Sequence, residues 1–217
     1  MSAAGLLSAA RAALTAGGSV HVDITANSTS GQVAFSEDAS ASGGRQVITI
    51  DGTGRATILL IDGVDYVQAD AEALQGLFQA SLQQATQDGG KWISLAPGEK
   101  LGTSTYDDVT AGITLSSVAQ ELQFGGHLTK ASPATVAGQP VIGVQAPLPA
   151  SDGLPAGAKV VLYVTDNAAL RPVRYELVGG GGTTNEFSFS HWGEKLTLTA
   201  PANAIPASSI GSGTIIT

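Results

Sequence analysis

The chain has 217 residues, a net charge of −8 and only 13% charged residues, whereas 43% of its residues are hydrophobic. This length allows one large domain with a real core, which buries roughly 70% of the surface of the unfolded chain. The hydrophobic content excludes a disordered chain, and the negative charge opposes binding to nucleic acid or to an anionic membrane surface. The lack of cysteine excludes disulfides, thiolate metal sites and thiol catalysis.

The first third of the chain is predicted to be a short helix followed by antiparallel strands. The helix covers residues 3–14, because its leucines recur at helical spacing and two glycines follow it. Hydrophobic and polar residues then alternate with a period of two, which is typical of half-buried strands. The predicted strands of this meander are residues 19–26, 31–36, 45–50, 56–61 and 64–68.

The middle of the chain changes to a helical period. Residues 70–87 are predicted to form one helix with an apolar stripe, and Asp70 is its expected N-cap residue. A strand at residues 91–95 follows, and then a loop at residues 107–112. A second amphipathic helix is predicted over residues 115–124, where two glycines end the apolar stripe.

The last third is predicted to return to strands. Residues 134–146 indicate a hairpin that turns near Gly138. Residues 160–164 and 173–177 are expected to pair as antiparallel neighbours, because they match in length and turn residues join them. Pro172 suits the start of the return strand, since proline has no N–H to donate to a neighbouring strand.

The chain is predicted to end in one more strand pair, formed by residues 185–190 and 194–200. The tail after it shows no periodicity and is expected to be partly mobile from about residue 203. All 217 residues are assigned to a single domain.

Several segments carry a resemblance to a known family. They are "SVHVDIT", "DGVDYVQ" with the helix after it, "KWISL", "TLSSVAQEL", "LYVTDNAALRPVRYE" and "FSHWGEKLTLTAPANA". With them the chain resembles the LolA/LppX-like lipoproteins, and in particular their actinobacterial LprG-type branch. The turn "DNAALRP" departs from the family, because it lacks the glycine often found there. The resemblance implies an α+β fold, in which a large curved antiparallel sheet, a half-barrel, carries a few helices on its concave face.

The resemblance also implies a function. It predicts a non-catalytic lipid carrier of the cell envelope that holds the acyl chains of a lipid or glycolipid in an apolar cavity, without a cofactor or a metal ion. It further implies an export signal and a lipidated cysteine upstream of Ser2, which would anchor the domain to the outer face of the cytoplasmic membrane. The candidate cavity-lining residues are Phe35, Leu59, Ile61, Tyr66, Leu74, Leu77, Phe78, Leu82, Trp92, Leu115, Val118 and Leu122.

Two alternatives stay open. The same sheet with a filled core would suit a protein-interaction or regulatory module that has a protein partner in the envelope. A hydrolase that uses the carboxylate pairs Asp62/Asp65 or Asp107/Asp108 is the other, although surface loop acids explain these pairs better. The three histidines are far apart in sequence and are interpreted as exposed or hydrogen-bonded sheet residues.

Overall fold

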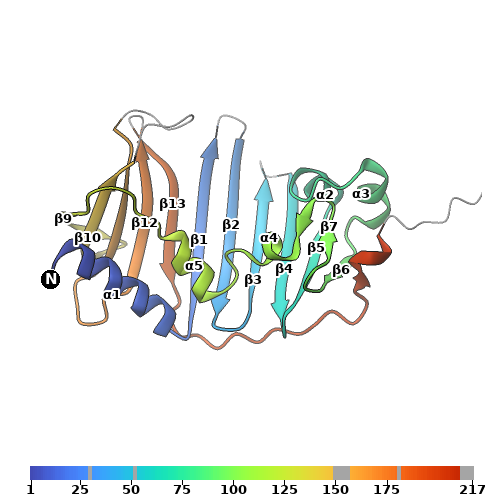
Figure 1. The fold of residues 1–217 in the computed structure, drawn as a ribbon, viewed down its shortest axis with the longest axis horizontal. Coiled ribbons are helices and arrows are strands. Elements are labelled where there is room, and N and C mark those ends of the chain that lie inside the picture. The colour runs from blue at the N-terminus through green and yellow to red at the C-terminus, as the bar shows by residue number, and fades with distance from the viewer. Residues whose placement is uncertain (29–30, 51–52, 149–156, 180–181, 211–217) are drawn as a thin grey trace, which may run out of the picture.

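The computed structural model describes residues 1–28, 31–50, 53–148, 157–179 and 182–210. In these ranges twelve strands form one open sheet, with the order β14-β6-β5-β4-β3-β2-β1-β13-β12-β11-β10-β9 (Figure 1). All neighbours are antiparallel except β14 and β6, which are parallel. The α+β fold class predicted from the sequence is therefore confirmed.

The strands and helices have the following bounds. The strands of the large sheet are β1 (Ser19–Ser28), β2 (Gly31–Ser40), β3 (Gly44–Ile50), β4 (Gly54–Ile61), β5 (Val64–Ala69), β6 (Trp92–Leu95), β9 (Thr129–Val136), β10 (Gln139–Pro147), β11 (Lys159–Thr165), β12 (Pro172–Gly179), β13 (Gly182–Ser190) and β14 (Ile205–Pro206). A small separate hairpin is formed by β7 (Lys100–Leu101) and β8 (Ser104–Thr105). The helices are α1 (Ala3–Ala16), α2 (Ala71–Gly76), α3 (Leu82–Asp88), α4 (Tyr106–Thr110), α5 (Leu115–Glu121) and the short 3-10 helix η1 (Ala207–Ser209).

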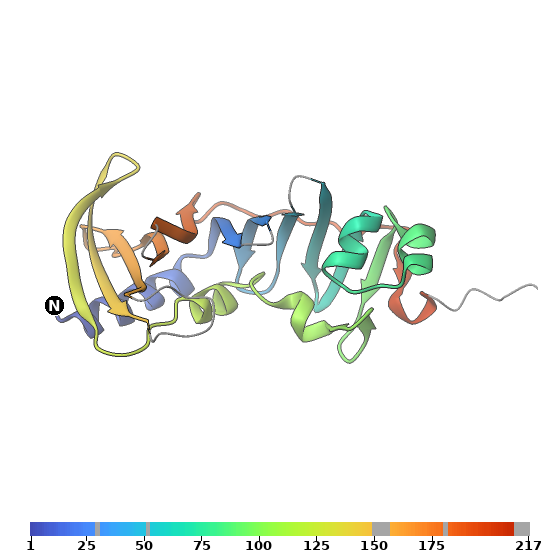
Figure 2. The same cartoon turned by 90° about the horizontal axis from the view of Figure 1, so that it is seen from above.

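Helices cover one face of the sheet, which is called the helix face below. Seen from above, α1, α5 and the segment with α4 follow one another along this side of the strands (Figure 2). Arg11 of α1 donates a hydrogen bond from its guanidinium to the main-chain oxygen of Leu122, directly after α5. This contact joins the first helix of the chain to a helix near its middle.

The hairpin predicted around "DNAALRP" is confirmed. β11 and β12 pair antiparallel, with Val160 opposite Leu177 and Leu162 opposite Tyr175. The register shifts between Tyr163 and Val164, where the return strand begins at Pro172. The meander of β1 to β5 also pairs in chain order as predicted.

The single helix predicted over residues 70–87 is wrong, because the chain forms two short helices there. Asp70 caps α2 as expected, since its side chain accepts a hydrogen bond from the N–H of Ala73. Gln79 then adopts a positive φ of 53°, which no α-helix accommodates. Ser81 begins α3 with a capping box to Gln84. The break turns Leu82 outward, and this side chain is 70% exposed.

The loop predicted at residues 107–112 is partly helical, because α4 occupies Tyr106–Thr110. Thr105 and Asp108 form the capping box that starts this one-turn helix. The acids that sequence reasoning assigned to a loop thus serve in part to begin a helix, since carboxylates in a first turn pair with free N–H groups.

The last predicted strand pair is also wrong. β13 pairs with β1 on one side and β12 on the other, so it has no free edge for residues 194–200. That segment begins beside Ser19, whose hydroxyl donates to the main-chain oxygen of Glu194. From there the chain runs along the sheet to β14 at the far edge (Figure 1). Residues 205–209 of the expected mobile tail form β14 and η1, and residues 211–217 lie outside the described part of the chain.

Two large clusters of buried hydrophobic side chains form the core. One joins α1 and α5 to the half of the sheet around β1, β10, β11 and β12, and the other joins α2, α3 and α4 to β3, β4, β5 and β6. Phe35 of β2 packs against both clusters. The boundary between the two clusters therefore crosses the middle of the helix face.

Candidate functional site

A pocket of about 420 Å³ opens where the two core clusters meet. Its floor is the helix face of the sheet, and its other walls come from α4, the end of α5 and the segment after α2. The apolar residues that line it are Ile24, Ala26, Phe35, Ile48, Ile58, Leu77, Phe78, Val109, Ala111 and Phe187.

Strand register builds the apolar floor. Phe187 of β13 stands opposite Ile24 of β1, Ile24 opposite Phe35 of β2, and Phe35 opposite Ile48 of β3. Directly opposed residues in antiparallel strands put their side chains on the same face. One row of four apolar side chains therefore crosses the sheet beneath the pocket.

The next row on the same face is polar at its centre. Glu37 of β2 stands opposite Val22 of β1 and Gln46 of β3, and Gln46 stands opposite Ile58 of β4. Gln46 donates a hydrogen bond of 2.5 Å from Nε2 to Oε1 of Glu37, whereas Oε2 of Glu37 is buried and has no partner within the described residues. Glu37 and Gln46 both line the pocket, so they give it a polar end.

The carboxyl groups that line the pocket differ in protonation. Burial raises the pKa of Glu37 to about 8; the bond from Gln46 opposes this rise and the charge of Glu121 adds to it. Burial also raises the pKa of Glu121, which lines the pocket from α5. Asp108 of α4 is different, because its hydrogen bonds with Thr105 lower its pKa. At neutral pH Glu37 is therefore mainly protonated, while Asp108 carries a negative charge.

Gly112 brings the backbone close to this end. It has a φ of +84°, and a Cβ built on it would lie 3.2 Å from Oε1 of Glu121, 3.3 Å from Oε1 of Glu37 and 3.4 Å from Nε2 of Gln46. These three side chains from three elements therefore converge on one point. Glycine suits the position because it adopts a positive φ without strain and adds no side chain there.

The residues predicted to line a cavity fall into four groups. Phe35, Leu77 and Phe78 line this pocket. Leu74 belongs to the cluster of β3 to β6, and Leu115, Val118 and Leu122 belong to the cluster of α1 and α5. Leu82 is exposed on α3. The remaining residues lie on the opposite face of the sheet; they are Leu59, Ile61, Tyr66 and Trp92. Neighbouring residues of a strand point to opposite faces. Their strand neighbours are the ones buried in the core of the helix face, namely Ile58, Leu60, Val67 and Ile93.

Sequence reasoning missed Glu37, Gln46 and Glu121. A signal was present for the first of them, because Glu37 is two residues after Phe35 and must share its face of the strand. No sequence pattern brings Glu121 to the same place, since it arrives on a helix from a distant part of the chain. The polar end of the pocket is therefore a product of the tertiary structure.

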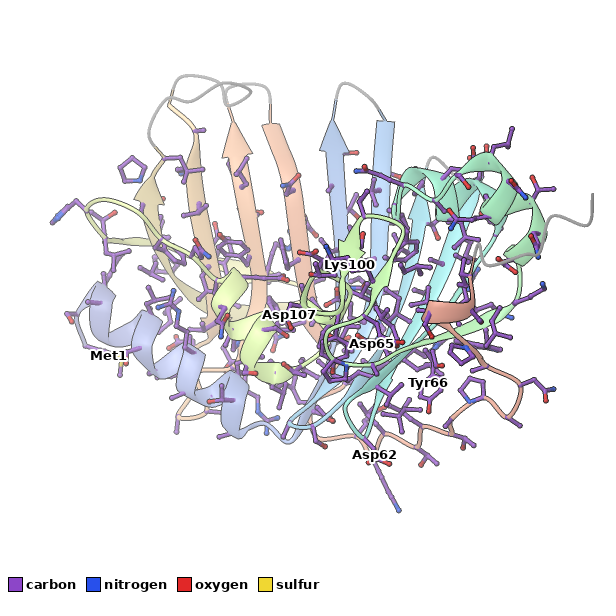
Figure 3. The ribbon with its side chains drawn as sticks, turned by 45° about the vertical axis from the view of Figure 1, so that its right-hand side comes forward. Met1, Asp62, Asp65, Tyr66, Lys100 and Asp107 are labelled. Atoms are coloured by element: carbon purple, nitrogen blue, oxygen red, sulfur yellow. The ribbon has the colours of Figure 1, made fainter. Side chains whose placement is uncertain are left out.

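Asp62 and Asp65 do not form a carboxylate pair. Asp62 lies in the turn between β4 and β5, whereas Asp65 lies inside, beneath the segment with α4 (Figure 3). Asp65 is fully buried, so its interpretation as a surface loop acid is wrong. The hydroxyl of Thr110 donates to its Oδ2 over 2.7 Å, and burial raises the pKa of Asp65 to about 6.

His21 agrees with its prediction as a hydrogen-bonded sheet residue. Its Nδ1 is 2.7 Å from Asp38 and its Nε2 is 3.3 Å from Asp23. Burial lowers the pKa of His21, but the bond to Asp38 and the charge of Asp23 outweigh burial and raise it. Within the described ranges, no three His, Asp or Glu side chains gather closely enough to hold a metal ion.

The arginines of "LRPVRYE" lie at a different pocket. The guanidinium carbon of Arg171 lies over Trp192, 5.5 Å from the ring centroid. Nε of Arg174 is 3.4 Å from Oε1 of Glu186, and both arginines line this second pocket. Arg174 stands opposite Ser188, and both alternate with Tyr175 and Phe187 of the helix face. Arg174 therefore lies on the opposite face of the sheet, and neither arginine lines the first pocket.

The open sheet with helices on one face is a fold that solved mycobacterial proteins share. Among solved structures, the chain is similar to LprF from Mycobacterium bovis, with a TM-score of 0.56, 17% identity, and coverage of 92% of this chain and 97% of LprF. It is also similar to the lipoprotein LppX from Mycobacterium tuberculosis, with a TM-score of 0.53, 16% identity, and coverage of 90% of this chain and 99% of LppX. At these identities the likeness establishes a shared fold.

A lipoprotein-sorting domain from Vibrio parahaemolyticus is more distant, with a TM-score of 0.32, 12% identity, and coverage of 90% of this chain and 95% of that domain. No protein-family model matches the chain, and no curated relative is detected from its sequence. None of the helices in the described ranges has the length and hydrophobicity that crossing a membrane requires.

Proposed function

We propose that this chain is a non-catalytic lipid-binding domain of the cell envelope, which shields an acyl chain in the pocket on its helix face. The observation that supports this most directly is an apolar pocket at the boundary between two core clusters, in a fold shared with LprF and the lipoprotein LppX. An ordinary filled core would continue across this boundary.

The size and lining of the pocket suit a hydrocarbon chain. Its volume of about 420 Å³ lies within the range of roughly 300–1,000 Å³ typical of small-molecule sites. Each CH₂ group that leaves water is stabilised by about 0.8 kcal/mol, so a chain binds here without many polar contacts. Phe35, Leu77 and Phe78 are the predicted lining residues that we assign to this contact.

The test is a ligand measurement in two parts. Native mass spectrometry of gently purified protein should show bound lipid mass, and delipidated protein should bind a fluorescent monoacylglycerol. Leu77→Trp should weaken binding of the probe, because the larger ring occupies space in the pocket. Leu82→Trp is the matched control, since Leu82 is 70% exposed and outside the pocket.

Two results would contradict the proposal. A protein that carries no lipid mass and binds no acyl probe would favour the alternative of an interaction module with a filled core. Equal weakening by Leu77→Trp and Leu82→Trp would show that the probe binds elsewhere on the surface.

A further inference from the structure

The polar end of the pocket contains a hydrogen-bonding atom that the protein does not satisfy. Glu37 is only 1% exposed, and it lines the pocket. Its Oε1 accepts the bond from Gln46, but its Oε2 has no partner within the described residues. A buried polar atom without a partner is unfavourable, so a bound molecule that supplies the partner gains affinity from it.

The position of Gln46 determines which kind of partner is missing. An amide N–H donates to Oε1 of Glu37, so Oε1 is the carbonyl-like oxygen of the protonated carboxyl group and the proton is on Oε2. Burial favours this protonated form, as the raised pKa of Glu37 of about 8 indicates. The unsatisfied group is therefore a donor, and its partner must be an acceptor oxygen.

The charges around the pocket restrict that acceptor further. Glu121 and Asp108 line the same pocket, and none of the described residues that line it is a lysine or arginine. Lys100 is near enough to Asp108 to lower its pKa slightly, but it does not line the pocket. A carboxylate or phosphate would meet negative charge here without a cation to offset it.

We propose that Glu37 is a specificity-determining residue, whose Oε2–H donates to an uncharged acceptor oxygen of a single-chain amphiphile, such as an ester carbonyl or a hydroxyl oxygen. The apolar row of Phe35 and Ile48 then holds the chain, while Glu37 and Gln46 hold the first oxygen of the headgroup. Fatty acids and lipids that place a phosphate at this point are disfavoured. This inference rests on the proposed lipid-binding function.

The experiment compares three ligands of equal chain length as competitors of the fluorescent monoacylglycerol at neutral pH. A fatty-acid methyl ester offers an uncharged acceptor, the free fatty acid offers a charged one, and the alkane offers none. We expect the ester to bind about fivefold more tightly than the alkane, which corresponds to one net hydrogen bond. The fatty acid should bind at least about tenfold more weakly than the ester, because it brings a charge next to other acids.

Variants assign this preference to Glu37. Glu37→Met should abolish the preference for the ester over the alkane, because the donor is lost. Glu37→Gln should retain it, because an amide still donates and accepts. Glu121→Gln should reduce the exclusion of the fatty acid. Asp65→Asn is the matched control, since Asp65 is a buried carboxyl group that does not line the pocket, and it should leave all three affinities in the same order.

The outcomes separate this inference from the proposed function. Equal affinities for all three ligands, or an unchanged ester preference in Glu37→Met, would overturn the role of Glu37 while leaving lipid binding intact. Tightest binding of the fatty acid would overturn the charge argument. Failure of the labelled monoacylglycerol to bind at all would refute the proposed function and, with it, the inference.

Discussion

Gln46 and Glu37 face each other across β3 and β2 and share a hydrogen bond of 2.5 Å in the interior of the protein. The pair is the polar centre of a row of side chains that has Val22 and Ile58 at its ends. Such a pair contributes little to stability by itself, because desolvation of a carboxyl group offsets the bond. Its consequences are therefore expected mainly in pH dependence and in ligand selection.

The free energy of unfolding should fall as the pH rises toward 8. The pKa of Glu37 is raised from 4.5 to about 8, so between these values the folded state keeps a proton that the unfolded state has lost. The contribution of this group is complete below pH 4.5 and is lost as the pH passes through about 8. The slope for one such group is at most about 1.4 kcal/mol per pH unit.

Denaturant titrations of Glu37→Gln and Asp65→Asn at several pH values check this. Glu37→Gln should remove most of the loss above pH 6, whereas Asp65→Asn should affect the range from 3.8 to about 6, where Asp65 titrates. A wild-type protein whose stability is constant from pH 5 to 8 would contradict the burial of both carboxyl groups.

Leu74→Ala should destabilise the protein more than Leu77→Ala. Leu74 is 1% exposed in the solid cluster against β4 and β5, so truncation leaves a void and should lower the free energy of unfolding by about 2–5 kcal/mol. Leu77 is half-buried and faces the existing pocket, so it loses fewer contacts. Denaturant midpoints of the two variants provide the comparison. A larger loss of stability in Leu77→Ala would contradict an open pocket beside Leu77.

Leu77→Trp extends the same comparison. Overpacking a solid core typically costs about 1–3 kcal/mol, whereas a pocket accepts a larger ring. We therefore expect Leu77→Trp to keep nearly wild-type stability, measured by the denaturant midpoint. If the midpoint falls as far as it does in Leu74→Trp, the space beside Leu77 is filled in solution.

Thr110→Val should destabilise the protein by about 1–3 kcal/mol, because Asp65 loses the hydroxyl that donates to its Oδ2. That bond favours the ionised carboxylate and lowers the pKa of Asp65 against the effect of burial, so its loss should raise this pKa above about 6. The destabilisation should therefore be larger at pH 8 than at pH 5. Thermal unfolding at both pH values measures the difference, and an equal loss at both would exclude Asp65 as the cause.

Gly44→Ala should be among the most harmful glycine substitutions. A Cβ at Gly44 would overlap the main-chain oxygens of Asp38 and Ile113, where the segment between α4 and α5 lies on the sheet. The overlap is with backbone, so it is relieved only by moving that segment, and we expect a loss of at least about 1–3 kcal/mol. Gly125→Ala is the control, since its added Cβ has no atom of another described residue within 4 Å, apart from its two chain neighbours. Similar thermal stabilities of the two variants would contradict this close approach.

The alternation of residues along the chain determined most of the sheet. The periods in β1 to β5 and in β11 and β12 predicted these strands and their antiparallel pairing, because a half-buried strand must alternate and short turns allow only adjacent pairing. The class of fold followed from the same pattern and from the resemblance of its motifs. Residues such as Leu74 and Val118 could also be predicted as buried, since their helical spacing places them on one stripe.

Only the tertiary structure decided which of these apolar residues surround a pocket. Leu59 and Tyr66 are large side chains that could line a cavity, but they alternate with Ile58 and Val67 along β4 and β5 and so lie on the opposite face. The helix predicted over residues 70–87 breaks at Gln79, which has a positive φ, and a new capped helix begins at Ser81. Hydrophobic periodicity does not mark this break, because the predicted apolar stripe continues through it. Residues 194–200 look like a strand, yet β1 and β12 already occupy both edges of β13.

The polar end of the pocket has the same origin. Glu37 alone reads as an ordinary charged residue of a strand, and Glu121 as an exposed position of a helix. Their raised pKa values arise from burial, which depends on the packing of α5 and Gly112 over β2 and β3. Sequence alternation determines which side chains share a face, but the protonation of a carboxyl group depends on everything that excludes water from it.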